Sequence, residues 1–304
     1  MPFQVSPGVN VTEVDLTTVI PAVSTSVGGF AGTFRWGPAE VVTSVDSSDT
    51  LVTLFGKPSS ASANNTRSFF SAANFLDYTN NLRLVRAIGS SALNATSNAS
   101  SGLLAKNDDA FDGLSDTDHM ILARHPGTMG NGLEVEICDS GDAFASWTGN
   151  TYFDAAPGNS IFGTAAGTAN DELHVLIKDS NTGTFTGTAG TILETWPFLS
   201  KASNGKDDQG NSNYFKDVIN RGSAYIRING APATVNSGPD TKSNWGTDTA
   251  TGKAYGTNTT TFANTLANGV DGDPTDTEII TGYSQFADAD KVDVSLIITG
   301  AHAC

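Results

Sequence analysis

The chain has 304 residues, with 16 basic and 32 acidic side chains and a formal net charge of −16. So few scattered cations form no basic stripe, which excludes a nucleic-acid-binding surface and attraction to an anionic membrane surface. No stretch approaches the ~20 consecutive apolar residues of a membrane-spanning helix. The 38% of apolar residues suffices for a buried core, so the composition predicts a folded, soluble protein.

Residues 1–22 are predicted to form an extended N-terminal arm. Ser6-Pro7-Gly8 is a turn signal, and 9–15 alternates apolar and polar residues with the period of a strand. The opening residues lack the basic and apolar regions of a signal peptide. This strand has no evident partner nearby, so it either pairs with an edge of its own sheet or adds to the sheet of a neighbouring molecule.

Residues 23–89 are predicted to form the first part of the body, a mixed α/β layer in the order β-β-α-α-β. The boundaries come from turn and capping residues. The expected elements are strands at 27–32 and 40–45, a helix capped by Ser47 or Ser48 and stopped at Gly56-Lys57-Pro58, a helix at 66–79, and a strand at 82–88.

Residues 90–118 are small, polar and acidic, which predicts a surface linker or insertion. Residues 119–270 are predicted to form a β-rich outer domain, with an exposed loop or ribbon at 140–170 and loops at 229–260. Its expected elements are strands at 119–124, 133–137, 173–177 and 224–228, and a short helix around 214–219.

Residues 271–304 are predicted to begin an inner domain. Thr275 and Glu278 have the spacing of a capping box, which opens a helix. A buried strand at 292–298 follows, and only six residues remain after it. Since such a strand is normally followed by a covering helix, we expect the sequence to be the N-terminal portion of a longer protein. The inner face of the expected helix comprises Ile279, Ile280, Tyr283 and Phe286.

The sequence contains no motif that indicates an enzyme active site. The cysteines Cys138 and Cys304 are far apart, which suits a reducing compartment and supplies no metal ligand pair. Residues 271–276 superficially resemble a calcium loop but lack its sixth-position glycine, so a turn entering a helix is preferred. The strand pair Glu134 and Glu136 is predicted to be solvated rather than a glycosidase pair. The histidines, predicted to be structural or surface residues, are His119, His125, His174 and His302.

Six short segments in the right order resemble the tail sheath proteins of T4-like bacteriophages, which are contractile. They cover both ends of the chain and much of its first ninety residues. The segments are Val5-Ser6-Pro7-Gly8-Val9-Asn10-Val11-Thr12-Glu13, Gly32-Thr33-Phe34-Arg35-Trp36-Gly37-Pro38-Ala39, Leu51-Val52 with Phe55-Gly56-Lys57-Pro58, 70–78, 82–87, and Tyr283 to Gly300 with its VDVSLIITG run.

The resemblance implies a structural subunit that is not an enzyme and binds no cofactor or metal. Such subunits stack as hexameric rings around a tail tube and contract to drive the tube through the host envelope. Their implied partners are other copies of the chain and the tail tube, baseplate and tail terminator proteins. The implied location is the virion, after assembly in the host cytoplasm. Nucleic acid and membrane are not expected partners.

The resemblance also assigns a role to the arm, which sheath proteins donate to the sheets of neighbouring subunits. The residues implied to lie between subunits are Pro7, Gly8, Val9, Val11 and Glu13, with 16–22 as the hinge. Two departures stand out. The stretch 90–118 is too short for the protruding domain of larger relatives, and sheath proteins continue beyond the equivalent of Gly300 into an inner, tube-facing domain.

A second interpretation is an acidic, β-rich module that binds carbohydrate or calcium, of the tail-fibre or surface-layer type. It would explain the loops rich in glycine, threonine and asparagine, and calcium at 271–276 would support it. A hydrolase ranks third, because it would need an acid–base pair that the sequence does not display.

Overall fold

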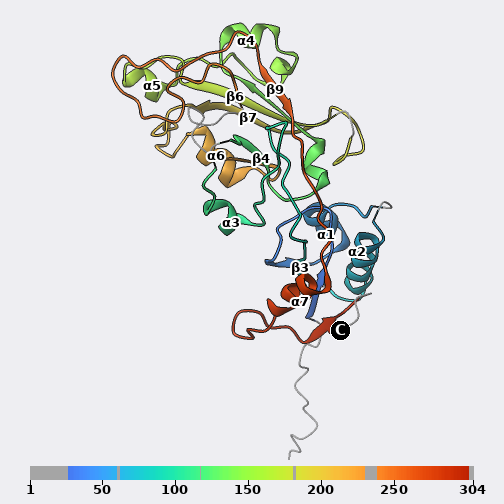
Figure 1. The fold of residues 1–304 in the computed structure, drawn as a ribbon. Coiled ribbons are helices and arrows are strands. Elements are labelled where there is room, and N and C mark those ends of the chain that lie inside the picture. The colour runs from blue at the N-terminus through green and yellow to red at the C-terminus, as the bar shows by residue number, and fades with distance from the viewer. Residues whose placement is uncertain (1–26, 60–61, 117, 181–182, 230–237, 301–304) are drawn as a thin grey trace, which may run out of the picture.

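A computed structural model describes residues 27–300, apart from 60–61, 117, 181–182 and 230–237. These residues form two bodies stacked end to end (Figure 1). The small body consists of 27–89 and 272–300, and the large body of 98–265. Between them runs a strap, formed by 90–97 and 266–271. None of the helices in the described ranges is long and apolar enough to cross a membrane.

The helices and strands are short, and the chain leaves the small body and returns to it. The α-helices are α1 (Ser48–Phe55), α2 (Ala63–Leu76), α3 (Asp108–Asp112), α4 (Gly141–Ser146), α5 (Ile161–Ala165), α6 (Phe215–Gly222) and α7 (Asp276–Ser284), with 3₁₀ turns at Thr128–Gly132 and Thr148–Tyr152. The strands are β1 (Gly28–Gly32), β2 (Val42–Val45), β3 (Leu82–Arg86), β4 (Ile121–Ala123), β5 (Leu133–Cys138), β6 (Glu172–Asp179), β7 (Ile192–Ser200), β8 (Ile226–Ile228), β9 (Phe262–Thr265) and β10 (Leu296–Ile298).

The small body is a mixed sheet between helices, which confirms the predicted mixed α/β layer. Its strand order is β10-β1-β3-β2, with β1 parallel to both neighbours and β2 antiparallel to β3. Consecutive strand residues point to opposite faces. A Cβ on Gly28 would contact the ring of Phe75, the penultimate residue of α2. A Cβ on Gly29 would contact the ring of Phe286, which lies two residues after the end of α7. The two helices therefore cover opposite faces of the sheet.

The predicted capping residues start and stop the first helix of the small body. The Ser47 hydroxyl accepts a hydrogen bond from the backbone N–H of Thr50, so Ser47 is the N-cap of α1. At the other end Gly56 has a φ of 76° and its N–H bonds the carbonyl of Val52, a conformation that favours glycine. Leu51 and Phe55 are fully buried.

The large body contains a four-stranded antiparallel sheet in the order β7-β6-β5-β9 and a separate β4–β8 pair. Its core includes the inward-facing residues of β5 and β6 and the aromatic rings of Phe215, Trp245 and Tyr255. The predicted strands at 133–137 and 173–177 are confirmed, although β6 is longer. The expectation of a loop or ribbon at 140–170 is wrong, because serine caps at Ser140 and Ser160 begin the short helices α4 and α5.

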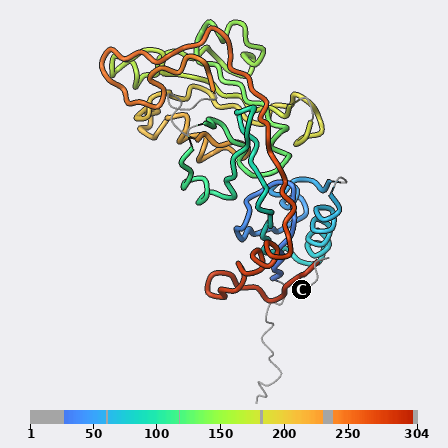
Figure 2. Tube along the Cα trace, in the orientation of Figure 1, coloured from blue at the N-terminus to red at the C-terminus, as the bar shows by residue number. Residues whose placement is uncertain are grey.

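The segment 90–118 differs from the predicted surface linker. Its residues Asn94, Ala95 and Thr96 are fully buried, and the strap is closed by β-bridges from Leu93 to Val270 and from Thr96 to Ala267. Figure 2 shows these two chain segments running side by side between the bodies. Small polar residues are tolerated because they are hydrogen-bonded: the Asn94 amide donates to the carbonyls of Ala105 and Ala123.

The segments 23–89 and 271–304 were predicted to belong to separate parts, but their described residues share one sheet. The edge strand β10 pairs in parallel with β1, with Leu296 opposite Gly28 and Ile298 opposite Phe30. The helix α7 begins with the predicted capping box, in which the Glu278 carboxylate accepts from the N–H of Thr275. The returning chain therefore completes the small body.

The buried guanidinium of Arg86, at the end of β3, joins the two bodies. It donates to the carbonyls of Phe34 (2.9 Å) and Gly37 (2.7 Å) in the small body and to that of Pro126 (2.8 Å) in the large body. Burial lowers the pKa of Arg86 to about 10, and the negative charge of Asp271 opposes this shift, so the side chain remains charged at neutral pH.

An indole from the small body reinforces this joint. Trp36 is 5% exposed and belongs to the core of the large body. Its ring packs edge-on against His125 and Phe185, each with 5.1 Å between centroids. Burial and the charges of Arg86 and Arg124 lower the pKa of His125 well below its usual value. The imidazole is therefore neutral and adds no positive charge beside Arg86.

Replacing Arg86 by methionine should destabilise the chain by about 3 kcal/mol, because three buried carbonyls would lose their donor. Urea unfolding at neutral pH measures this loss. The matched control is Arg83→Met on the same strand. Its guanidinium bonds the exposed Ser44 hydroxyl and, among the described residues, no buried carbonyl, so the cost should be about 0.5 kcal/mol or less. Equal losses for the two variants would contradict the central role of Arg86.

Candidate functional site

The residues predicted to lie between subunits are Pro7, Gly8, Val9, Val11 and Glu13, and all five lie outside the described residues. Their role stays a prediction. The described surface nevertheless shows where apolar side chains reach solvent. Nine large apolar residues are exposed in the described ranges, and six of them belong to the small body, namely Val41, Phe70, Tyr78, Ile280, Leu296 and Ile297. This body therefore has the surface better suited to contact another protein.

The strand β10 carries two of these six exposed residues. It lies at the edge of its sheet, and the Leu296 and Ile297 side chains are 48% and 47% exposed. A strand is therefore present within the predicted range 292–298, but it is not buried as predicted. A continuous apolar run is typical of a strand covered on both faces, but β10 has one strand neighbour among the described residues. An edge strand of this kind presents unpaired backbone groups to a further strand.

The helix α7 adds a further exposed apolar residue to the same body. Ile279 is buried as predicted, but Ile280 is 67% exposed, so its assignment to the inner face is wrong. The helix is anchored instead through Tyr283, whose hydroxyl donates to the carbonyl of Ile298 at 2.7 Å. This bond fixes α7 against β10, and it leaves Ile280 pointing to solvent.

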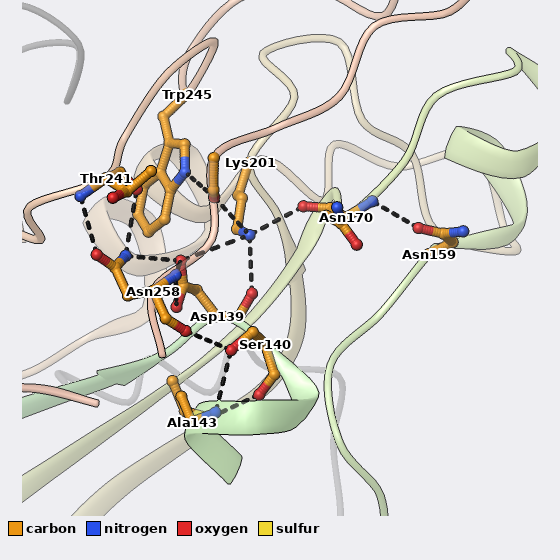
Figure 3. A network of polar contacts seen from close by, with 11 residues as sticks. Asp139, Ser140, Ala143, Asn159, Asn170, Lys201, Thr241, Trp245 and Asn258 are labelled. Atoms are coloured by element: carbon orange, nitrogen blue, oxygen red, sulfur yellow. Dashed lines mark hydrogen bonds and ion pairs between the residues drawn. The ribbon is translucent and has the colours of Figure 1, made fainter. Parts of the chain in front are cut away.

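The large body contains a buried ammonium group, that of Lys201, which was not predicted from the sequence (Figure 3). Lys201 is fully buried and donates to the carbonyls of Asp139 (2.9 Å), Asn170 (2.9 Å) and Gly256 (3.2 Å). Its Nζ lies 5.1 Å from the centre of the Trp245 ring and 3.8 Å from a carboxylate oxygen of Asp139. The ammonium group thus holds three loops together through their backbone carbonyls, which is a structural role. A lone lysine in a polar stretch gives no sequence signal for it.

The acidic pair on β5 is not a solvated face, which corrects the prediction. Both carboxylates bind the ammonium of Lys178, at 3.1 Å for Glu134 and 2.7 Å for Glu136. The second oxygen of Glu136 accepts from the Trp147 indole at 2.7 Å. These contacts use both carboxylates in a cross-strand network, so neither is free to act as the acid of a glycosidase.

The suspected calcium loop is a turn entering α7, as preferred from the sequence. The Asp271 carboxylate accepts from the backbone N–H (2.7 Å) and the hydroxyl (2.8 Å) of Thr128. Within the described ranges no three His, Cys, Asp or Glu side chains are grouped as metal ligands. His174 is buried between the rings of Phe153 and Phe198 and accepts the N–H of the latter, which is a structural role.

Comparison with known proteins finds partial similarity to phage tail sheath proteins. No protein-family model matches the chain. Curated relatives are tail sheath proteins of phages: that of Salmonella phage ViI is 30% identical over 192 residues, 62% of this chain and 28% of the relative. That of Vibrio phage KVP40 is 44% identical over 92 residues (30% and 13%), and that of Enterobacteria phage T4 is 40% identical over 83 residues (27% and 12%).

The chain is therefore a homologue of phage tail sheath proteins, and the predicted resemblance to those of T4-like phages is confirmed. It spans 12–28% of the length of these relatives. Crystal structures of sheath tail proteins from Listeria innocua and Desulfitobacterium hafniense also align with it. The TM-scores are 0.44 and 0.41 at 10% and 15% identity, over 91% and 90% of this chain and 41% of each structure.

Stability should rise with pH between about pH 8 and pH 9 because of Lys201. Burial lowers its pKa from 10.5 to about 8. In this window the unfolded chain keeps a proton that the folded chain has lost, so the free energy of unfolding increases, by about 1 kcal/mol. Above pH 9 Cys138 opposes this, since burial raises the pKa of its thiol to about 11.

Urea unfolding across this window measures the effect. The rise should vanish in Lys201→Met and persist in Lys57→Met, which removes an exposed lysine. NMR titration of ¹³C-labelled lysines in the unmodified protein gives a second readout, in which one ammonium titrates near pH 8. Lysine signals that all titrate together near pH 10.5 would contradict the assigned burial.

Proposed function

We propose that the chain is a structural subunit of a contractile phage tail sheath. Copies of it would stack as hexameric rings around the tail tube and shorten to drive the tube through the host envelope. The observation that carries this proposal is the 44% identity over 92 residues with the KVP40 tail sheath protein. The role requires complementary surfaces between copies and no cofactor.

The described surface supports a role in self-association. Apolar side chains are exposed on β10, α7 and α2 of the small body, where burial against a second copy would stabilise a polymer. The excess of acidic residues keeps separate subunits soluble before assembly. On this proposal the small body faces neighbouring subunits, and the large body is the outer part of the sheath.

The arm is proposed as the second contact. Its alternating sequence would let backbone hydrogen bonds hold it in the sheet of a neighbouring subunit while Val9 and Val11 fill pockets. Pro7-Gly8 would set its direction, Glu13 would complete the strand, and 16–22 would act as the hinge. The other proposed partners are the tail tube, baseplate and tail terminator proteins, in a virion assembled in the host cytoplasm.

Asp at both Val9 and Val11, introduced into the phage-encoded subunit, should abolish sheath polymer seen by negative-stain electron microscopy. Two charges would replace apolar side chains that are proposed to be buried against a neighbouring subunit, and burying a charge is costly. The matched control places Asp at Asn10 and Thr12, which the alternation of the sequence assigns to the other face of the proposed strand, and it should permit assembly. Normal sheaths with Asp at both valines would count against the arm.

Lysine at both Ile280 and Leu296 should also prevent assembly without unfolding the chain. The two side chains are 67% and 48% exposed, so the free energy of unfolding should change by only about 0.5 kcal/mol. The control places lysine at Tyr152 and Ile161 of the large body, which are 54% and 75% exposed. If sheaths form with lysine at Ile280 and Leu296 but not with lysine at Tyr152 and Ile161, the large body rather than the small body faces the neighbouring subunits.

A further inference from the structure

A serine, a histidine and an aspartate meet at the surface of the large body. The Ser101 hydroxyl lies 3.0 Å from Nε2 of His119, and Nδ1 of His119 lies 3.0 Å from both carboxylate oxygens of Asp116. Ser101 follows the first strap segment, whereas His119 stands two residues before β4. The strap brings the loop 98–101 against the start of β4, so the trio depends on the tertiary fold.

The hydrogen-bonding partners assign the proton on the imidazole. A carboxylate only accepts hydrogen bonds, so the Asp116 contact places the proton on Nδ1 of His119. In the neutral imidazole the Nε2 atom is then an acceptor, and the Ser101 hydroxyl donates to it. This is the arrangement in which a histidine can take a serine proton as a general base.

Neighbouring groups hold all three residues in place. The Asp116 carboxylate accepts from the backbone N–H of His119 (3.0 Å) and from the amide of Asn229 (2.9 Å). The carbonyl of Ser101 accepts from the hydroxyl of the buried Thr96 at 2.7 Å. The histidine is 5% exposed, so its ring is fixed by packing as well as by hydrogen bonds.

The serine itself is accessible. Ser101 is exposed, and the backbone N–H groups of Ser101 and Gly102 donate to no acceptor within the described part of the chain. The site therefore offers a nucleophile, a base and an orienting carboxylate.

We propose that Ser101 is an activated nucleophile that reacts with small carboxylic esters. Its Oγ forms a bond to the ester carbonyl carbon while its proton passes to Nε2 of His119. The carbon–oxygen bond to the alcohol breaks, and His119 returns the proton to the departing alkoxide. Water, deprotonated by the same imidazole, then releases the carboxylic acid and restores the serine. Asp116 is a positioning residue in this sequence.

This activity goes beyond the sheath role and does not depend on it. No G-x-S-x-G motif surrounds Ser101, so the sequence gives no sign of the site. The failure of one proposal leaves the other untouched, because one is measured by covalent chemistry and the other by polymer formation.

A fluorophosphonate probe tests the proposal, since attack by Ser101 forms an Oγ–P bond and expels fluoride. Intact mass and peptide mapping should find one adduct, at Ser101. Ser101→Ala should lose it, and Ser100→Ala, which removes the adjacent exposed serine, should keep it. His119→Gln and Asp116→Asn should slow labelling about 100-fold or more, as expected when a general base is lost or misplaced. Melting temperatures verify that each variant is folded.

A second measurement compares the folded chain with the unfolded chain. The folded chain should be labelled about 10² times faster than the urea-unfolded chain, in which every serine is exposed but none is activated. The folded chain should also hydrolyse p-nitrophenyl acetate, and Ser101→Ala should not. Labelling that is no faster in the folded chain, or that persists in folded His119→Gln, would overturn the proposal. The trio would then be a structural tie that holds the loop 98–101.

Discussion

The relative position of the two bodies depends on one buried cation. The guanidinium of Arg86 is fully buried with three carbonyl groups as its acceptors, two from the small body and one from the large body. Burial of a charge is costly unless its hydrogen bonds are complete, so these carbonyls must stay where they are. A rotation of one body against the other would leave the charge unsatisfied. The joint is therefore strongly resistant to bending.

The chain reaches this joint by crossing between the bodies more than once, and each crossing is hydrogen-bonded. The two strap segments bridge to one another, and Asp271 in the second segment binds Thr128 in the large body. At Gly127, with a φ of 133°, a Cβ would come within 2.9 Å of the carbonyl oxygen of Arg35 and of Asp271 Oδ1. Only a residue without a side chain fits this approach, so the joint is specified at the backbone as well as by Arg86.

The sequence predicts the small body well because its elements begin and end at residues with a local physical signature. Ser47, Gly56 and the Thr275–Glu278 pair each act within their own turn. It fails where burial is decided by distant residues. The strand β10 is apolar on both faces yet lies at an edge, and Asn94 is polar yet buried. The strand β7 was not predicted, and it contains Pro197, a residue type that argues against a strand. The site trio was missed for the same reason, since Ser101 meets His119 only through the strap.

A stiff joint has a consequence for the proposed sheath role. A lattice that contracts must change its geometry somewhere, and a subunit whose two bodies are locked by Arg86 and Trp36 offers little change within itself. The energy difference between the two lattice states would then reside in contacts between subunits. Apolar contacts on the small body suit this purpose, because their attraction is non-directional and tolerates sliding. The proposed arm would keep neighbours linked while rigid subunits turn.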